Sequence, residues 1–207
     1  MTLSRSFYRT DAETLARKLL GQRLVRILPS GDRLSGLIVE TEAYLGEPDA
    51  ASHAYRLRRT PRNEAMYARA GTAYIYFTYG MHFCFNVVCG RVDQPLAVLV
   101  RALQPEEGLE HMRRARSRLQ DHDLCSGPAK LCQALDLNRD LNAIDLTTDP
   151  RLFLERARPR LDDTLIVKTP RIGVDYAGSW AAKPLRFFLR GNPHISRKTV
   201  PNRRKNR

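Results

Sequence analysis

A run of alternating tyrosines that stops at a glycine constrains the fold more than any other part of this sequence. In strand geometry Tyr74 and Tyr76 fall on one face, and Tyr79 falls on the other. Gly80 gives the backbone the freedom for a sharp reversal, and residues 82–89 are again suited to a strand. We therefore predict a β-hairpin over residues 74–89. Aromatic residues favour strands for packing reasons alone, so this pattern leaves open whether they serve a core or a binding surface.

The tip of that hairpin carries two bulky apolar residues. Tyr79 and Met81 flank the turn, where side chains are poorly buried. An exposed tip of this kind is suited to contact another molecule.

A second strand delivers carboxylates. Residues 33–42 read as an antiparallel strand, on which Glu40 and Glu42 share one face while Thr41 takes the other. A surface carboxylate is most often simply solvated, and Glu40 fits a structural salt bridge with one of the many arginines. One edge of this strand is therefore acidic where it leaves the sheet.

The remaining elements follow from periodicity and from turn residues. Thr10 and Glu13 have the spacing of a capping box and predict a helix that ends near residue 20. The segment 138–160 carries no clear pattern. Further strands are predicted over residues 22–28, 96–102, 165–168 and 184–190, and further helices from Thr60-Pro61 to before Gly71, from Pro105 through Leu119, and over 126–135.

The charge balance points to a polyanion. The chain of 207 residues has 35 Lys and Arg against 22 Asp and Glu, a net charge of +13. Most of the cations are arginine, whose fork donates two parallel hydrogen bonds to phosphate. Arg58 and Arg62 surround the predicted helix start at Thr60-Pro61, a natural phosphate site, although an ordinary capped surface helix fits the local sequence equally well.

The sequence also suggests what the protein does without. The cysteines and histidines show no paired C-x-x-C or four-ligand spacing, so we expect reduced thiols, no metal and no cofactor. The longest apolar runs are too short to cross a bilayer, so we expect a soluble cytoplasmic monomer, nucleoid-associated if the host is a bacterium. We expect one domain over residues 1–195 and a flexible basic tail over 196–207.

Ordered blocks along the chain resemble the alkyladenine (3-methyladenine) DNA glycosylase family, enzymes that excise alkylated and deaminated purines. The resemblance covers residues from about 11 to 191. Its blocks are Glu40-Thr41-Glu42-Ala43-Tyr44-Leu45-Gly46, Thr60-Pro61-Arg62-Asn63, Tyr79-Gly80-Met81 with Asn86, Arg101-Ala102-Leu103, Cys125-Ser126-Gly127-Pro128 with Lys130-Leu131-Cys132, and Lys183-Pro184-Leu185-Arg186-Phe187.

This resemblance implies an α+β fold: a single mixed domain around a curved antiparallel β-sheet, with flanking helices and a protruding hairpin that enters the DNA minor groove. It implies a double-stranded DNA partner that contains damaged purines such as 3-methyladenine, 7-methylguanine, hypoxanthine or ethenoadenine. The implied roles are Glu42 for water activation with Arg101 orienting it, Tyr44, His53 and Tyr76 for the flipped base, Asn86 for disfavouring the guanine amine, and Tyr79 as the wedge beside Met81.

The chemistry is consistent with one catalytic carboxylate. Glycosidic hydrolysis normally needs an acid and a base, but an alkylated purine already carries the positive charge that an acid would supply. No lysine lies in the two segments that carry Glu42 and the tyrosines, which favours a monofunctional enzyme that uses water. Two alternatives remain: a non-catalytic binder of damaged or bent DNA or structured RNA, and a hydrolase of free nucleosides, which the charge and the exposed hairpin disfavour.

Overall fold

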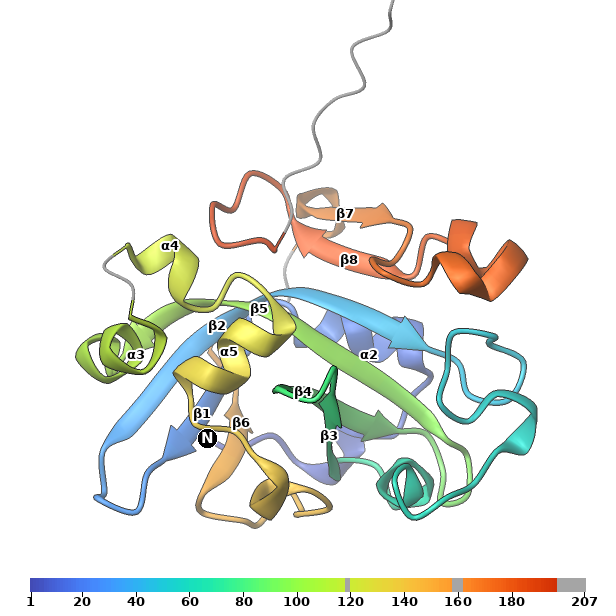
Figure 1. Cartoon of the computed structure of the whole chain (residues 1–207), viewed down its shortest axis with the longest axis horizontal. Helices are drawn as coiled ribbons and strands as arrows, with labels where there is room; N and C mark the ends of the chain where they lie inside the picture. The colour runs from blue at the N-terminus through green and yellow to red at the C-terminus, as the bar shows by residue number, and fades with distance from the viewer. Residues whose placement is uncertain (118–119, 158–161, 197–207) are drawn as a thin grey trace, which may run out of the picture.

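A long strand, β2 (Arg33–Tyr44), runs through the middle of the protein, and the other elements are arranged around it. The computed structural model describes residues 1–117, 120–157 and 162–196. β2 pairs with β1, β5 and β8, always antiparallel, in a sheet of eight strands whose main path is β3-β4-β5-β2-β1-β6. Both long strands, β2 and β5, curve across the molecule (Figure 1). The predicted fold class, a single α+β domain around a curved antiparallel sheet, is confirmed.

The elements alternate between short helices and strands of different lengths. The strands are β1 (Arg23–Ile27), β2, β3 (Ala73–Thr78), β4 (His82–Cys89), β5 (Leu96–Glu107), β6 (Leu152–Glu155), β7 (Ile166–Thr169) and β8 (Arg186–Leu189). The α-helices are α1 (Arg5–Tyr8), α2 (Ala12–Leu19), α3 (Leu109–Arg116), α4 (Asp121–Leu124) and α5 (Pro128–Ala134). The 3-10 helices are η1 (Tyr55–Leu57), η2 (Glu64–Tyr67), η3 (Arg139–Leu141), η4 (Asp163–Leu165) and η5 (Asp175–Ala182).

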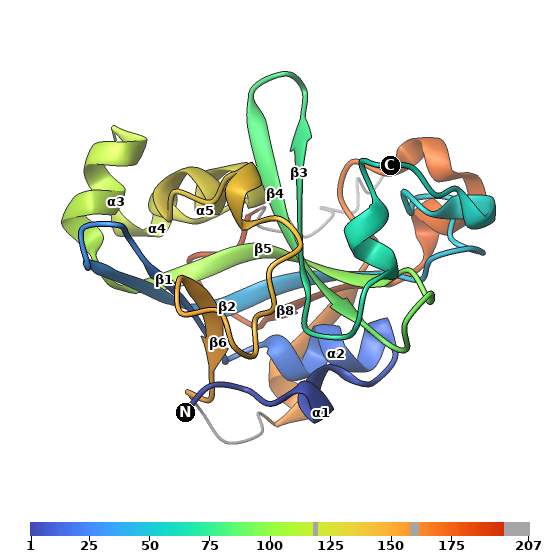
Figure 2. The same ribbon diagram turned by 90° about the horizontal axis from the view of Figure 1, so that it is seen from below.

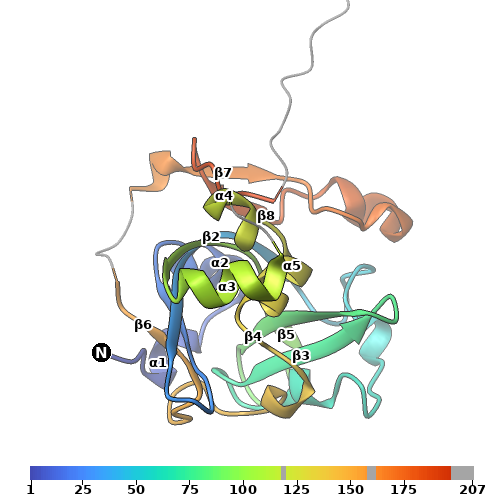
Figure 3. The same ribbon diagram turned by 60° about the vertical axis from the view of Figure 1, so that its left-hand side comes forward.

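Helices cover both faces of β2 and β5. Helix α2 packs on one face and α5 on the other, as Figures 2 and 3 show together. This explains why β2 is buried along ten consecutive residues instead of alternating between buried and exposed. Leu15 and Leu19 of α2 are fully buried, and the hydroxyl of Thr41 donates to the carbonyl of Ala16 at 2.9 Å. Thr41 therefore faces α2, which leaves Glu42 on the opposite face, as predicted.

The register between β2 and β5 shifts on both sides of Glu40. Ile38 lies opposite Leu103, Glu40 opposite Ala102, and Thr41 opposite Val100. Val39 and Arg101 are therefore both left without a direct cross-strand partner. Such bulges re-aim side chains, and here the bulge on β5 directs the Arg101 guanidinium toward the carboxylates of β2.

The predicted hairpin projects from the body of the protein (Figure 2). Only residues 86–89 of β4 pair with β5, so the outer half of the β3–β4 ribbon has no other strand beside it. The hairpin loop consists of the three residues 79–81, and it places both Tyr79 (φ 51°) and Gly80 (φ 67°) in the left-handed region. A glycine adopts this conformation at low cost, whereas a tyrosine does not. The backbone of Tyr79 is therefore strained.

Three local predictions are wrong. The helix expected from Thr60-Pro61 is only the single 3-10 turn η2, because the buried Asn63 side chain accepts from the Thr60 N–H at 2.7 Å and donates to the carbonyls of His53 and Arg58. That amide closes a loop instead of opening a helix. The helix expected at Pro105 is strand instead.

Pro105 lies in β5 opposite Gly36, next to a further register shift where proline's missing N–H is tolerated. Helix α3 begins only at Leu109, and the predicted position Leu119 lies outside the described residues. In α2 the cap is Asp11, which accepts from the Thr14 N–H at 2.8 Å, and not the predicted Thr10.

Two other parts of the sequence prediction, residues 138–160 and the basic tail from residue 196, are partly described by the structure. The segment without clear pattern, residues 138–160, contributes the edge strand β6, which pairs with β1. Ser196, the first residue of the predicted basic tail, contacts Glu40, and residues 197–207 lie outside the described residues.

Candidate active site

A cavity of about 310 Å³ opens beside the base of the hairpin, and most of the predicted site residues line it. It lies where β2, β3, β4 and β5 meet the loops around residues 51–53 and 172–176. Its predicted lining residues are Tyr44, His53, Tyr76, Tyr79, Asn86 and Arg101, and others include Tyr74, Cys84, Leu99, Ile172 and Tyr176. A larger cavity of about 520 Å³ lies among Arg9, Arg69 and Arg91 and contains none of the predicted residues, so volume alone does not identify the site.

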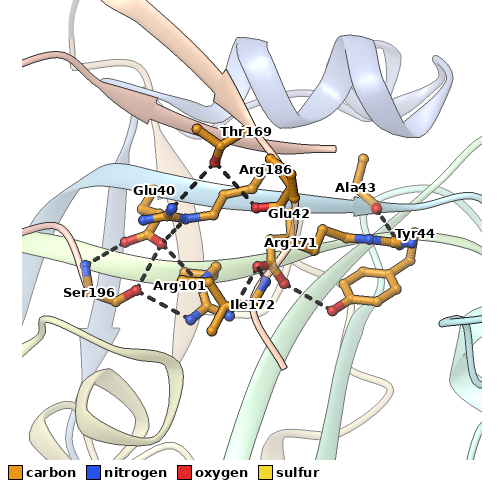
Figure 4. A network of polar contacts seen from close by, with 11 residues as sticks. Glu40, Glu42, Ala43, Tyr44, Arg101, Thr169, Arg171, Ile172, Arg186 and Ser196 are labelled. Carbon is orange, nitrogen blue, oxygen red and sulfur yellow. Dashed lines mark hydrogen bonds and ion pairs between the residues drawn. The ribbon is translucent and has the colours of Figure 1, made fainter. Parts of the chain in front are cut away.

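Glu42 is completely buried and does not itself line the cavity, but its carboxylate contacts three residues that do. Three groups donate to or pair with its carboxylate (Figure 4): the Tyr44 hydroxyl at 2.9 Å, the Ile172 backbone N–H at 2.8 Å, and the Arg101 guanidinium at 3.2 Å. A buried charge is tolerated only when it is paired and hydrogen-bonded, and these contacts meet that condition. They also fix the orientation of the carboxylate.

Arg101 is held between both acids of β2. Its Nε donates to Glu40 at 3.0 Å, and Arg186 donates to the same oxygen of Glu40 at 2.7 Å. Ser196 adds a backbone N–H at 2.5 Å and a hydroxyl at 2.8 Å. Burial would raise the pKa of Glu40, but Arg101, Arg186 and the Ser196 N–H together hold that pKa below its ordinary value. Glu40 is thus the salt-bridged carboxylate that was expected from the sequence, and it anchors Arg101.

Behind Tyr44 lies an ion pair that sequence reasoning missed. Arg171 donates to both oxygens of Asp49, at 2.6 and 2.8 Å, and to the carbonyl of Ala43 at 3.0 Å. Both charged side chains are fully buried. The guanidinium lies 4.7 Å from the centre of the Tyr44 ring. Because Ile172 follows directly in the chain, the same anchor places the N–H that reaches Glu42.

Three aromatic rings form the wall across from these charges. His53 Nδ1 and the Tyr74 hydroxyl are 2.7 Å apart, and His53 lies edge-on to Tyr76 with ring centres 4.5 Å apart. Burial lowers the pKa of His53 to about 4, with smaller contributions from Arg62 and Arg58. Burial also raises the pKa of Tyr76. The wall is therefore uncharged at neutral pH.

Asn86 lies at the back of the cavity, at the inner end of the hairpin. It is directly opposite Tyr74 in the β3–β4 register and opposite Leu99 in the β4–β5 register. Its amide nitrogen donates to the Tyr74 carbonyl at 3.1 Å. The amide is thus held in one orientation at the wall of the cavity.

The predicted DNA-contacting residues lie on the hairpin tip and on the neighbouring loop, and of these only Tyr79 lines the cavity. Tyr79 is 85% exposed and Met81 is 69% exposed, both on the hairpin tip. Arg58 and Arg62 are exposed on the neighbouring loop, and Arg62 donates to the Phe77 carbonyl at 3.0 Å. These side chains are therefore accessible to another molecule.

No further chemical group is evident at the site. Among the described residues, no cluster of three or more His, Cys, Asp or Glu side chains could hold a metal ion. All four cysteines are free and buried, as expected from their spacing. No helix within the described ranges is long and apolar enough to cross a membrane.

Comparison with known proteins identifies the family. The sequence profile of the methylpurine-DNA glycosylase (MPG) family matches residues 6–193. DNA-3-methyladenine glycosylase from Homo sapiens is 47% identical over 94% of this chain and 67% of its own length, and the Mus musculus protein of that name is 45% identical, with 61% of its length covered. A putative 3-methyladenine DNA glycosylase from Myxococcus xanthus is 46% identical over 98% of this chain and 97% of its own length.

The chain belongs to the methylpurine-DNA glycosylase family, which confirms the resemblance drawn from the ordered blocks. It spans about two thirds of the length of the mammalian relatives and nearly all of the bacterial one. All residues that line the 310 Å³ cavity fall within the range matched by the family profile.

Prediction from the His53 environment. Nuclear magnetic resonance titration of His53 should give a midpoint near pH 4, because burial disfavours the imidazolium form. The unfolded chain protonates this residue near pH 6.5, so between pH 6.5 and 4 it binds more protons than the folded chain does. The contribution of His53 to stability is therefore present above pH 6.5 and is lost as the pH falls toward 4. A His53→Gln variant assigns the resonance, and a midpoint above 6 would contradict the buried neutral ring.

Proposed function

We propose that this protein is a monofunctional DNA glycosylase of base-excision repair, which flips a damaged purine out of duplex DNA and hydrolyses its N-glycosidic bond with water activated by Glu42. The observation that carries the proposal is the fully buried Glu42 carboxylate, held by three donors at the wall of an aromatic cavity. The expected substrates are 3-methyladenine, 7-methylguanine, hypoxanthine and ethenoadenine.

The exposed hairpin suits the extrusion step. A base inside the duplex is unreachable, so the enzyme must bear a few kcal/mol of unstacking. Tyr79 at the tip can fill the space that the base leaves, which offsets part of that cost. Met81 lies beside it, and the exposed Arg58 and Arg62 can pair with phosphates on the neighbouring backbone.

The cavity suits a flat purine. The rings of Tyr44 and Tyr76, with His53 between Tyr74 and Tyr76, offer faces and edges on which a base can stack. Electron-rich rings favour a cationic base such as 3-methyladenine over a neutral one. Asn86, fixed by its bond to the Tyr74 carbonyl, stands where it can disfavour the exocyclic amine of guanine.

In the chemical step Glu42 accepts a proton from water, and the water oxygen bonds to the sugar C1′. The glycosidic bond breaks and its electron pair goes to the purine. An alkylated purine leaves as a neutral molecule because it already carries a positive charge. Arg101, which is tied to Glu40, pairs with the Glu42 carboxylate and fixes its orientation. A neutral purine leaves more slowly unless it is protonated.

The deciding experiment is incubation with duplexes that carry 7-methylguanine, hypoxanthine or ethenoadenine. Free base should appear, and the strand should break only after alkali treatment of the abasic site. Borohydride should trap no covalent complex, because no amine attacks the sugar. A protein that shifts these duplexes in a gel without releasing base is a binding protein instead. A trapped complex in the amount of the excised base would overturn the hydrolytic mechanism.

Prediction for the general base. Glu42→Gln should lower the single-turnover excision rate by about a hundredfold or more, since the amide cannot accept the proton of water. Lesion binding should persist, because glutamine preserves the shape of the side chain. Glu40→Gln serves as the matched comparison on the same strand. Near-normal excision by Glu42→Gln would sink the assignment.

Prediction for the hairpin tip. Tyr79→Ala should weaken lesion-specific affinity by roughly 1–3 kcal/mol, the scale of a lost base–aromatic stack, while the thermal unfolding midpoint stays unchanged. Both expectations follow from an exposed fraction of 85%, which leaves almost no packing to lose. Tyr79→Phe should retain most of the affinity. If Tyr79→Ala unfolds, the residue belongs to the core and the wedge assignment fails.

A further inference from the structure

The buried pair of Asp49 and Arg171 lies beside the Tyr44 ring and outside the cavity lining. Tyr44 lines the cavity, and Arg171 does not. The Arg171 guanidinium is nevertheless 4.7 Å from the centre of the Tyr44 ring and close beside it in Figure 4. Asp49 binds both of its terminal nitrogens, and neither side chain is exposed to solvent. Tyr44 thus separates a fixed pair of charges from the space where a base would stack.

A charge behind an aromatic ring changes what the front of that ring binds. The face of the ring is negative, so it attracts a cation, and a cation already held on one face weakens the attraction at the other. A stacked base would lie about 3.5 Å in front of Tyr44. It would therefore be about 8 Å from the guanidinium, a distance at which a buried unit charge is felt strongly.

The carboxylate of Asp49 offsets the guanidinium in the intact pair. With both charges present, a base on Tyr44 experiences only their difference. Removing Asp49 leaves an unmatched positive charge behind the ring, and removing Arg171 leaves an unmatched negative one. The pair is also geometrically linked to the site, because Arg171 anchors Ile172, whose N–H contacts Glu42.

We propose that the Asp49–Arg171 pair sets the discrimination between positively charged and neutral purines, acting through Tyr44. This inference rests on the proposed function, because it assumes a purine stacked on Tyr44. Asp49 and Arg171 are positioning and specificity-determining residues and touch neither the base nor the water. Their opposite charges offset each other at Tyr44, so the site accepts both alkylated cationic bases and neutral deaminated ones.

The test compares two variants that break the same pair with opposite electrostatic consequences. Asp49→Asn and Arg171→Gln are each titrated with one duplex carrying 7-methylguanine, which is cationic, and another carrying hypoxanthine, which is neutral. The lesion nucleotides have 2′-fluoro sugars, which suppress hydrolysis during the measurement. The readout is the ratio of the two dissociation constants within one protein preparation, which does not depend on the fraction of protein that is folded.

Relative to the unmodified protein, Asp49→Asn should shift this ratio about tenfold against the cationic base, and Arg171→Gln should shift it about tenfold in its favour, as expected for one charge at this distance. Arg171→Lys keeps the charge but loses the two parallel hydrogen bonds to Asp49. It should therefore weaken the binding of both duplexes and leave the ratio of their dissociation constants unchanged. Asp49→Asn combined with Arg171→Gln should restore the ratio.

A control variant breaks an ion pair that involves no cavity residue. Asp145→Asn removes the partner of Arg5 and should leave the ratio as it is. If Asp49→Asn and Arg171→Gln leave the ratio unchanged, or shift it in the same direction, the pair has only a structural role and the inference is wrong. Release of base from ordinary 2′-deoxy duplexes by the unmodified protein tests the proposed function separately.

Discussion

The structure depends on how buried charges are paired at the end of β2. Two carboxylates on this strand, Glu40 and Glu42, are removed from water, which costs several kcal/mol per ion unless each is paired. Arg101 contacts both of them, and Arg186 shares Glu40. Because both acids in this network have cationic partners, the protein can hold two carboxylates out of water beside the cavity.

The buried ion-pair network and the exposed hairpin have different structural roles. The charges sit on strands that helices α2 and α5 cover on both faces, so their geometry is set by the core. The hairpin joins that core through residues 86–89 of β4, and its outer part presents Tyr79 to solvent. The proposed catalytic centre and the proposed DNA-contacting surface thus come from two neighbouring parts of one sheet.

The residues found from sequence are those whose signal is local. Alternation indicated the acidic strand end and the tyrosine run, and the family resemblance then implied roles for Glu42 and Tyr76. Asp49 and Arg171 were missed because 122 residues separate them, and an isolated aspartate or arginine in a basic chain carries no signal of burial. The helices expected at Thr60 and Pro105 failed for a related reason. At Thr60 the hydrogen bonds of the Asn63 side chain, and at Pro105 the pairing of β5 with β2, override the local helix propensity.

The two register shifts beside Glu40 have a consequence for how such a chain can vary. They cancel, so Leu99 and Leu103 keep a common register with β2, and only the short stretch between the shifts, which includes Arg101, is displaced. An added or deleted residue within β5 would move the arginine away from its two acids and turn every later side chain to the opposite face. The loop at residues 90–95, before β5 begins, carries no such constraint. Insertions and deletions among related chains should therefore occur in the loop at residues 90–95 and be absent from β5.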